Sequence, residues 1–222
     1  MSNVVVYTAL CGPKSVVQKP LWTPEGVDYV CFTDQPGDLP EPWQKRPLEK
    51  HCDDPCRNAK KYKVLPHWCV SEYDANIWID ANFKVTRGFG ELLPLLYRYE
   101  MVLFKHFERD CIYQEAEVCK AMGLDDPAVI DRQMDRYRNV NFPKRCGLAE
   151  CGTMIRRNSK AVRTLMCFWD WEIGVGSRRD QLSFMYSLWG TGMLDEIKIL
   201  DRTARDGYYH EWTPHLCMGP LK

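Results

Sequence analysis

The stretch Asn76-Ile77-Trp78-Ile79-Asp80-Ala81-Asn82 decides how the rest of the chain is interpreted. Its run of apolar residues is short enough to form a buried strand, and polar residues follow the run directly. In extended geometry the side chains of Asp80 and Asn82 point to the same side. A carboxylate and an amide oxygen there suit a hard cation such as Mg2+ or Mn2+. The alternative is a plain strand end with a turn, where Asp and Asn are common.

Apolar runs and helical stretches alternate on both sides of this segment. Further strands are predicted at residues 4–10, 29–33, 101–104 and 148–155. Helices are predicted at 55–67, 91–99, 113–122, 127–139, 159–173 and 179–189, and the last thirty residues are expected to be irregular. The alternation predicts an α/β fold with a largely parallel sheet flanked by helices. In such a sheet ligands bind beyond the carboxyl ends of the strands.

Length and composition limit the class of protein. A chain of 222 residues suits one domain over residues 1–222, and 45% apolar residues argue against disorder. Thirty basic and thirty acidic residues give no net charge, so a nucleic-acid partner is not expected. No run approaches 18 apolar residues, so no transmembrane segment is predicted.

Cysteine usage and the first residues predict a cytoplasmic protein. Met1 to Asn3 carry no charged side chain and lead straight into a strand pattern, so no secretory signal is expected. Eleven cysteines without a spacing framework are predicted to be reduced thiols. The abrupt end at Lys222 suggests a domain cut from a longer protein.

Basic residues gather just before the central strand. Seven basic and three acidic residues lie between Lys45 and Lys63. On the predicted helix, Arg57 and Lys60 share a face and Lys61 lies beside them. This pattern is either a solvated helix face or a site for an anionic ligand such as phosphate.

Three later segments carry further candidates. Ser177-Arg178-Arg179-Asp180-Gln181 opens a helix and suits sugar hydroxyls or phosphate, although a dipole-favoured Asp or an Arg–Asp surface pair explains it equally. Glu150 lies in a strand-like run, so it needs either a buried arginine partner or an acceptor to bind. His210 and His215 are candidate nitrogen ligands for a Mn2+-like ion, or plain structural histidines.

Several segments taken together resemble a known family. They are Val5–Ala9, Val30–Asp34, Arg57–Lys63, Ile77–Asn82, Phe104–His106, Arg109–Glu115, Glu150–Gly152 and Ser177–Phe184. From about residue 4 to 190 the chain resembles the TOD1/MUCI70-like glycosyltransferase-like family, once known only as a domain of unknown function. That family includes plant and bacterial proteins and the N-terminal domain of large algal virus proteins.

The resemblance implies a GT-A fold with a donor half at about residues 1–100 and an acceptor half at about 101–222. The implied nucleotide-sugar-binding residues are Tyr7, Thr8, Ala9, Asp34, Arg57, Lys60, Lys63, Ile79, Asp80 and Ala81. The implied metal ligands are Asp80, Asn82, His215 and His210. The implied catalytic residues are Asp180, Glu150 and Arg179.

Within these sets the resemblance assigns roles. Tyr7 and its neighbours would flank the base and ribose, with Asp34 near the uracil or ribose. Asp80-Ala81-Asn82 would be the D-x-D equivalent, with an uncharged Asn at its last position. His215 to Lys222 resembles a His-x-x-Gly-x-x-Lys motif with one extra residue, so His210 is the substitute metal ligand.

The resulting prediction is a Mn2+- or Mg2+-dependent enzyme that moves a sugar from a UDP-sugar to a glycan, with retention. A divalent cation relieves the charge on the leaving nucleoside diphosphate. Asp180 or Glu150 would stabilise the anomeric carbon or orient the acceptor. The viral resemblance suggests a capsid-protein glycan as acceptor, in the host cytoplasm. A non-catalytic GT-A-like module that binds a nucleotide or glycan is the alternative. A nucleotidyltransferase would require a better phosphate loop than Cys11-Gly12-Pro13-Lys14.

Overall fold

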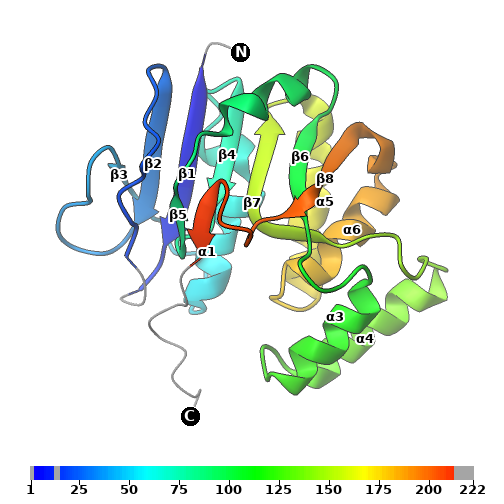
Figure 1. The fold of residues 1–222 in the computed structure, drawn as a ribbon. Helices are drawn as coiled ribbons and strands as arrows, with labels where there is room; N and C mark the ends of the chain where they lie inside the picture. Colours follow the sequence, from blue (N-terminus) through cyan, green and yellow to red (C-terminus); the bar gives the residue numbers. More distant parts are fainter. Residues whose placement is uncertain (1–2, 13–15, 213–222) are drawn as a thin grey trace.

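A seven-stranded sheet forms the centre of the computed structural model, which describes residues 3–12 and 16–212 (Figure 1). Its order is β3-β2-β1-β4-β7-β6-β8. The strands are β1 (Val4–Leu10), β2 (Val27–Thr33), β3 (Gln44–Pro47), β4 (Ala75–Ile79), β6 (Met101–Lys105), β7 (Ala149–Arg157) and β8 (Ile197–Thr203). Strand β7 runs antiparallel to β4 and β6, and the other pairs are parallel. The predicted α/β class with a mostly parallel sheet flanked by helices is confirmed.

The two faces of the sheet are covered differently (Figure 1). One face packs against α1 (Pro55–Val64), α5 (Lys160–Val175) and α6 (Gln181–Gly190). A helical hairpin of α3 (Ile112–Ala121) and α4 (Pro127–Asn139) lies outside α6, and α2 (Pro66–Cys69) and η3 (Leu194–Glu196) are single turns. The other face is covered by η1 (Phe89–Glu91), η2 (Leu93–Tyr97) and a small antiparallel sheet of β5 (Phe83–Val85) and β9 (His210–Trp212).

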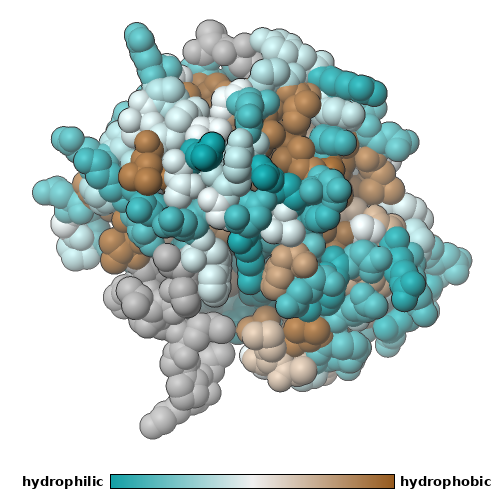
Figure 2. Space-filling view, viewed as in Figure 1, coloured by the Kyte–Doolittle hydropathy of each residue, from teal (hydrophilic) through white to brown (hydrophobic). Residues whose placement is uncertain are grey.

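Strand alternation divides the apolar side chains between two cores. Tyr7 and Trp78 lie on the helical face, whereas Val6, Ile77 and Ile79 lie on the other. Strands β1 and β4 are buried along their whole length, and their residues are accordingly mostly apolar. Strands from both predicted halves of the chain share this sheet, since β4 pairs with β7. The visible surface is mostly hydrophilic, with small scattered apolar patches (Figure 2).

Several predicted boundaries were wrong, and proline explains two of them. The helix expected over 91–99 is two short 3-10 stretches, because Pro94 has no N–H to donate. The helix expected over 55–67 ends at Val64, since Pro66 disfavours helical backbone at the residue before it. The last thirty residues are not wholly irregular, because β8 and β9 form there.

The topology brings three chain segments that carry predicted site residues to one edge of the sheet. Asp34 follows β2, and Asp80 follows β4, at the carboxyl ends of parallel strands. Because β7 is antiparallel, its first residues, including Glu150, lie at the same edge. No helix in the described part of the chain is both long and apolar enough to cross a membrane.

Candidate functional site

Lys63 is the centre of the candidate site. It lies on the last turn of α1, and only 3% of the residue is exposed. Its Nζ is 2.5 Å from Asp180 Oδ2 and 3.3 Å from Asp80 Oδ1. Lys60, one turn earlier on the same face, places its Nζ 3.1 Å from Asp180 Oδ1. The structure thus brings the two lysines predicted to bind the nucleotide-sugar, Lys60 and Lys63, into contact with the predicted carboxylate Asp180. Lys63 also contacts Asp80.

Asp180 stands at the start of α6 as a buried, ionised group. Its side chain makes no capping hydrogen bond to the helix, so helix capping does not explain its position. Burial alone would raise the pKa of Asp180, but Lys60, Lys63 and Arg179 hold it well below its usual range. Burial alone would lower the pKa of Lys63, but the carboxylates of Asp180 and Asp80 raise it. Both Lys63 and Asp180 therefore stay charged at neutral pH.

Asp80 is held by its own strand and remains open to solvent. Its Oδ1 accepts a hydrogen bond of 2.7 Å from Trp78 Nε1, which alternation places on the same side of the strand. Its backbone N–H donates to the carbonyl of Gly152 on β7 (2.8 Å), which fixes the start of the turn. The Asp80 side chain is 36% exposed, so an incoming ligand can reach it.

The predicted metal ligands lie in different surroundings, and the structure does not describe all of them. Within residues 3–12 and 16–212, no three His, Cys, Asp or Glu side chains form a group able to hold a metal ion. His210 is buried against the rings of Phe83 and Phe104, and its Nε2 lies 3.3 Å from Thr153 Oγ1. Burial lowers the pKa of His210 to about 4, so it is a neutral core side chain in this structure. His215 lies outside the described residues.

Glu150 has the partner that its burial demands. Its Oε1 accepts a hydrogen bond of 3.0 Å from Arg205 Nε, which follows β8. Burial raises the pKa of Glu150, with Arg205 opposing and the nearby Asp80 carboxylate adding to the rise. Sequence reasoning expected either an arginine or an acceptor here. It did not identify Arg205, which lies 55 residues further along the chain.

Tyr7, predicted to flank the base and ribose of a nucleotide, has its side chain in the core, and the flanking role stays a prediction. Its side chain is fully buried, accepts a hydrogen bond from Arg156 and donates one of 3.2 Å to the carbonyl of Tyr62. Buried Arg156 also donates to the carbonyl of Lys63 (2.7 Å). Helix carbonyls at a C-terminus need donors, so Tyr7 and Arg156 fix the end of α1 that presents Lys63.

The other predicted donor residues of β1 and β4 are also interior. Thr8, Ala9 and Ile79 are all buried within the sheet. Their side chains are therefore not exposed in this structure, and their predicted contact with a nucleotide stays a prediction. Ala81, by contrast, is only partly buried and packs against a small apolar cluster around Leu10.

Asp34 and Arg57 both contact the chain itself. Asp34 accepts a hydrogen bond of 2.9 Å from the N–H of Gly12 and lies 2.8 Å from Lys50 Nζ, contacts that lower its pKa. Gly12 has a φ of +77°, which favours glycine in this turn after β1. Arg57 donates to the carbonyl of Ile173 (2.7 Å), so its guanidinium braces the connection from α5 to α6.

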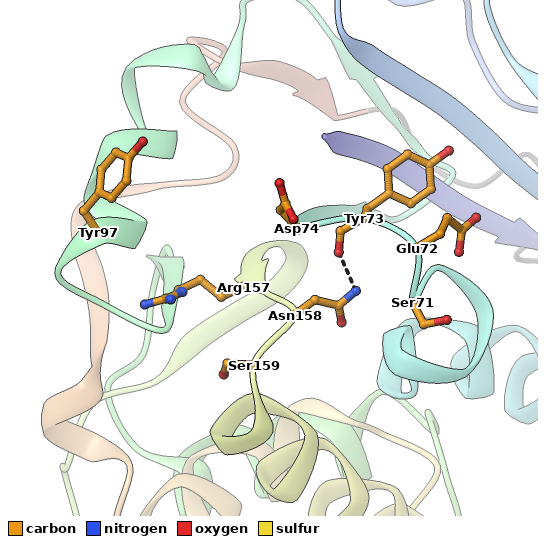
Figure 3. Close-up of a pocket in the computed structure, with 8 residues that line it drawn as sticks. All are labelled: Ser71, Glu72, Tyr73, Asp74, Tyr97, Arg157, Asn158 and Ser159. Atoms are coloured by element: carbon orange, nitrogen blue, oxygen red, sulfur yellow. Dashed lines mark hydrogen bonds between the residues drawn. The ribbon is translucent and has the colours of Figure 1, made fainter. Parts of the chain in front are cut away.

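A cavity of about 560 Å³ lies at the opposite edge of the sheet (Figure 3). It is lined by Ser71, Glu72, Tyr73, Asp74, Tyr97, Arg157, Asn158 and Ser159. Asn158 Nδ2 donates to the carbonyl of Tyr73 (2.8 Å) and ties the end of β7 to the residues before β4. None of the predicted site residues lines this cavity, so size alone does not locate the site.

Comparison with known proteins identifies the family. The model of the TOD1/MUCI70 glycosyltransferase-like domain matches residues 48–200. The chain belongs to this family. The matched region contains Lys60, Lys63, Asp80, Glu150 and Asp180, whereas Tyr7, Asp34 and His210 fall outside it.

Two individual proteins show the extent of the similarity. A protein of Arabidopsis thaliana, the probable hexosyltransferase MUCI70, is 28% identical over 139 residues, which cover 58% of this chain and 24% of that protein. The chain therefore matches about a quarter of that relative's length. The apo structure of the bifunctional glycosyltransferase WbbM aligns with 89% of this chain and 38% of its own, at 12% identity and a TM-score of 0.46.

Proposed function

We propose that this chain is a metal-dependent glycosyltransferase that moves a sugar from a UDP-sugar to a glycan acceptor. The observation that carries the proposal is the buried Asp180 carboxylate, held by Lys60 and Lys63 beside Asp80. Family membership supports the coarser class of glycosyltransferase. The donor, the metal and the acceptor are the finer part of the proposal.

The charges at the site favour an anionic donor. Three cations, Lys60, Lys63 and Arg179, face two carboxylates, Asp80 and Asp180, which leaves one net positive charge. An anion that enters this edge would be attracted, and lysine is a usual partner of phosphate oxygens. Each hydrogen bond to a charged group contributes about 1.5–3 kcal/mol, so two of them would hold a diphosphate leaving group well.

The residues at the end of β4 fit a divalent cation that is shared with the substrate. Mg2+ commonly takes one or two protein carboxylates and completes its shell with water and phosphate oxygens. Asp80 offers a partly exposed carboxylate, and Asn82 offers an amide oxygen two residues on. When bound, Mn2+ or Mg2+ would act as a Lewis acid on the diphosphate.

The two acidic residues would act on the sugars. Asp180 stays ionised, so its charge would stabilise the positive anomeric carbon as the diphosphate leaves, in a transfer that we propose proceeds with retention. The pKa of Glu150 is raised above its ordinary value and so lies closer to neutral pH. A carboxylate with such a pKa is a stronger base, which suits Glu150 to take a proton from an acceptor hydroxyl. Arg179 would balance the charge beside Asp180.

A non-catalytic nucleotide- or glycan-binding module is the second candidate. The observation that favours it is Asn82, which brings no charge to the position where the resemblance implies a carboxylate. In addition, Lys63 already neutralises part of the charge on Asp80. Turnover distinguishes the two candidates, because only the enzyme would release a sugar from its donor.

Donor hydrolysis with matched variants tests the proposal. We would incubate the chain with a panel of UDP-sugars, with and without Mn2+, and measure released UDP. Asp180→Asn should lower turnover at least 10³-fold while UDP still binds, whereas Asp131→Asn, an exposed carboxylate on α4, should behave like the unchanged chain. Equal turnover in the Asp180→Asn variant, or no UDP binding by the folded chain, would overturn the proposal.

A further inference from the structure

The segment Gly176–Arg179, which leads into Asp180, is held from outside the site by the α3–α4 hairpin. Gln133 on α4 is buried, and its Oε1 accepts a hydrogen bond of 2.9 Å from the backbone N–H of Ser177. The fit is tight, because a Cβ on Gly176 would lie 2.7 Å from Gln133 Cδ. Any shift of α4 would therefore reach the residues that precede Asp180.

Asp125, at the turn between α3 and α4, holds the next part of the segment. Its Oδ2 accepts hydrogen bonds of 2.6 Å from Ser177 Oγ and 2.8 Å from the backbone N–H of Arg178. Burial would raise the pKa of Asp125, but these contacts lower it, so the carboxylate is ionised. Two residues of the hairpin therefore bind two consecutive backbone N–H groups.

A buried network fixes the orientation of Gln133. Its Nε2 donates to the hydroxyl of Tyr137 (2.8 Å), which donates to Glu172 Oε2 (2.7 Å). Glu172 is fully buried and also accepts from Arg136 Nη1 (2.8 Å). Because the amide nitrogen of Gln133 is engaged by Tyr137, its oxygen must face Ser177.

Helix α1 holds the same segment from the other side. Lys60 donates to the carbonyl of Arg178, and Arg57 donates to the carbonyl of Gly176 (3.3 Å). Two N–H groups of the segment, those of Ser177 and Arg178, thus bind the hairpin, whereas the carbonyls of Gly176 and Arg178 bind the helix that carries Lys60. Asp180 follows directly after this doubly held segment.

We propose that Gln133 and Asp125 are positioning residues, which set the Asp180 carboxylate against Lys60 and Lys63 without touching a substrate. The proposal rests on the proposed function and assigns the α3–α4 hairpin a role in turnover. Misplacement of a reacting group by about 1 Å can cost about 10²-fold in rate. Loss of either contact should therefore lower kcat more than donor affinity.

Matched variants separate positioning from general stability. Gln133→Met keeps the length of the side chain but removes the acceptor for Ser177, and Asp125→Asn removes a charge at constant size. Asp131→Asn is the control, because it makes the same change on an exposed residue of the same hairpin. We expect kcat for donor hydrolysis to fall about 10- to 100-fold in the first two variants, with donor KM within about threefold. The control should keep both values.

Amide hydrogen exchange gives a readout that does not depend on turnover. The N–H of Ser177 should lose protection in Gln133→Met, which removes its acceptor. The N–H of Arg178 should be less protected in Asp125→Asn, because the amide oxygen is an uncharged and weaker acceptor than the carboxylate, while the amides of β1 stay protected. Unchanged kcat, a parallel change in kcat and KM, or retained protection at both amides would overturn the positioning role. If the unchanged chain turns over no donor, the proposed function fails, and exchange alone then decides whether the hairpin holds the segment.

Discussion

Replacement of Lys63 by methionine should destabilise the protein in a pH-dependent way. Lys63 is buried between Asp180, at 2.5 Å, and Asp80, at 3.3 Å. Removal of one partner from a buried ion pair costs about 3–5 kcal/mol, because the remaining charge is left without compensation. Lys60 still lies 3.1 Å from Asp180, so the lower part of that range is expected, about 3 kcal/mol.

The pH dependence follows from the depressed pKa of Asp180. A carboxylate whose pKa is lower in the folded state stabilises the protein above its unfolded value, about 3.9. That contribution is lost as the pH falls below about 4 towards the folded value. Lys63→Met makes the pKa of Asp180 rise, so the variant has less of this contribution to lose. The difference between the two proteins should therefore stay constant down to the folded pKa of Asp180 in the variant and shrink at lower pH.

Urea unfolding at a series of pH values from about 7 down to about 2 measures both effects. Lys61→Met is the matched control, since Lys61 is the adjacent cation on α1 but pairs with Asp170 at the surface. A surface pair contributes about 1 kcal/mol or less, so the control should change little at any of these pH values. Equal destabilisation by the two variants at pH 7, or a Lys63→Met effect that does not depend on pH, would refute the reasoning.

Three further substitutions test how the site is supported. Arg156→Met should lower the free energy of unfolding by about 2–4 kcal/mol, because buried acceptors lose their donor, and a loss under 0.5 kcal/mol in urea unfolding would contradict this. Tyr7→Phe should lower the free energy of unfolding by about 1 kcal/mol and leave the affinity for UDP, measured by calorimetry, unchanged. Weaker UDP binding by a stable variant would instead support the predicted base-flanking role. Gly152→Ala would place a Cβ 2.6 Å from the Phe83 ring and 3.5 Å from Asp80 Oδ2, so UDP affinity should fall about tenfold; unchanged affinity would show that the turn adapts.

The sequence predicted the central strand and its polar end well, because β4 carries its signal locally. Three consecutive apolar residues, Ile77 to Ile79, followed by Asp80 indicate a buried strand that ends at a sheet edge. The shared face of Arg57 and Lys60 was equally readable from helical spacing. The sequence could not show whether that face is solvated or paired, because its partner Asp180 lies 120 residues after Lys60 in the chain.

For Tyr7, the sequence predicts which face of β1 the side chain occupies but not which residue it contacts. Alternation puts its side chain on the face of β1 that α1 covers, and its hydroxyl needs a buried partner. That partner, Arg156, lies 149 residues away and has no local signal. Glu150 is a related case, since the cost of burial predicted either an arginine partner or an acceptor, and only the fold identified Arg205 as a partner. The positioning contacts of Gln133 and Asp125 also depend on packing between distant helices.

Calorimetric titration of UDP, with and without Mn2+, into the unchanged chain and Asp80→Ala tests the central claim most directly. We expect UDP binding that strengthens with Mn2+ and is lost in Asp80→Ala, because Asp80 is the partly exposed carboxylate at the end of β4. Folded protein that binds no UDP, or that binds UDP equally well without Asp80, would contradict a donor site at this edge of the sheet.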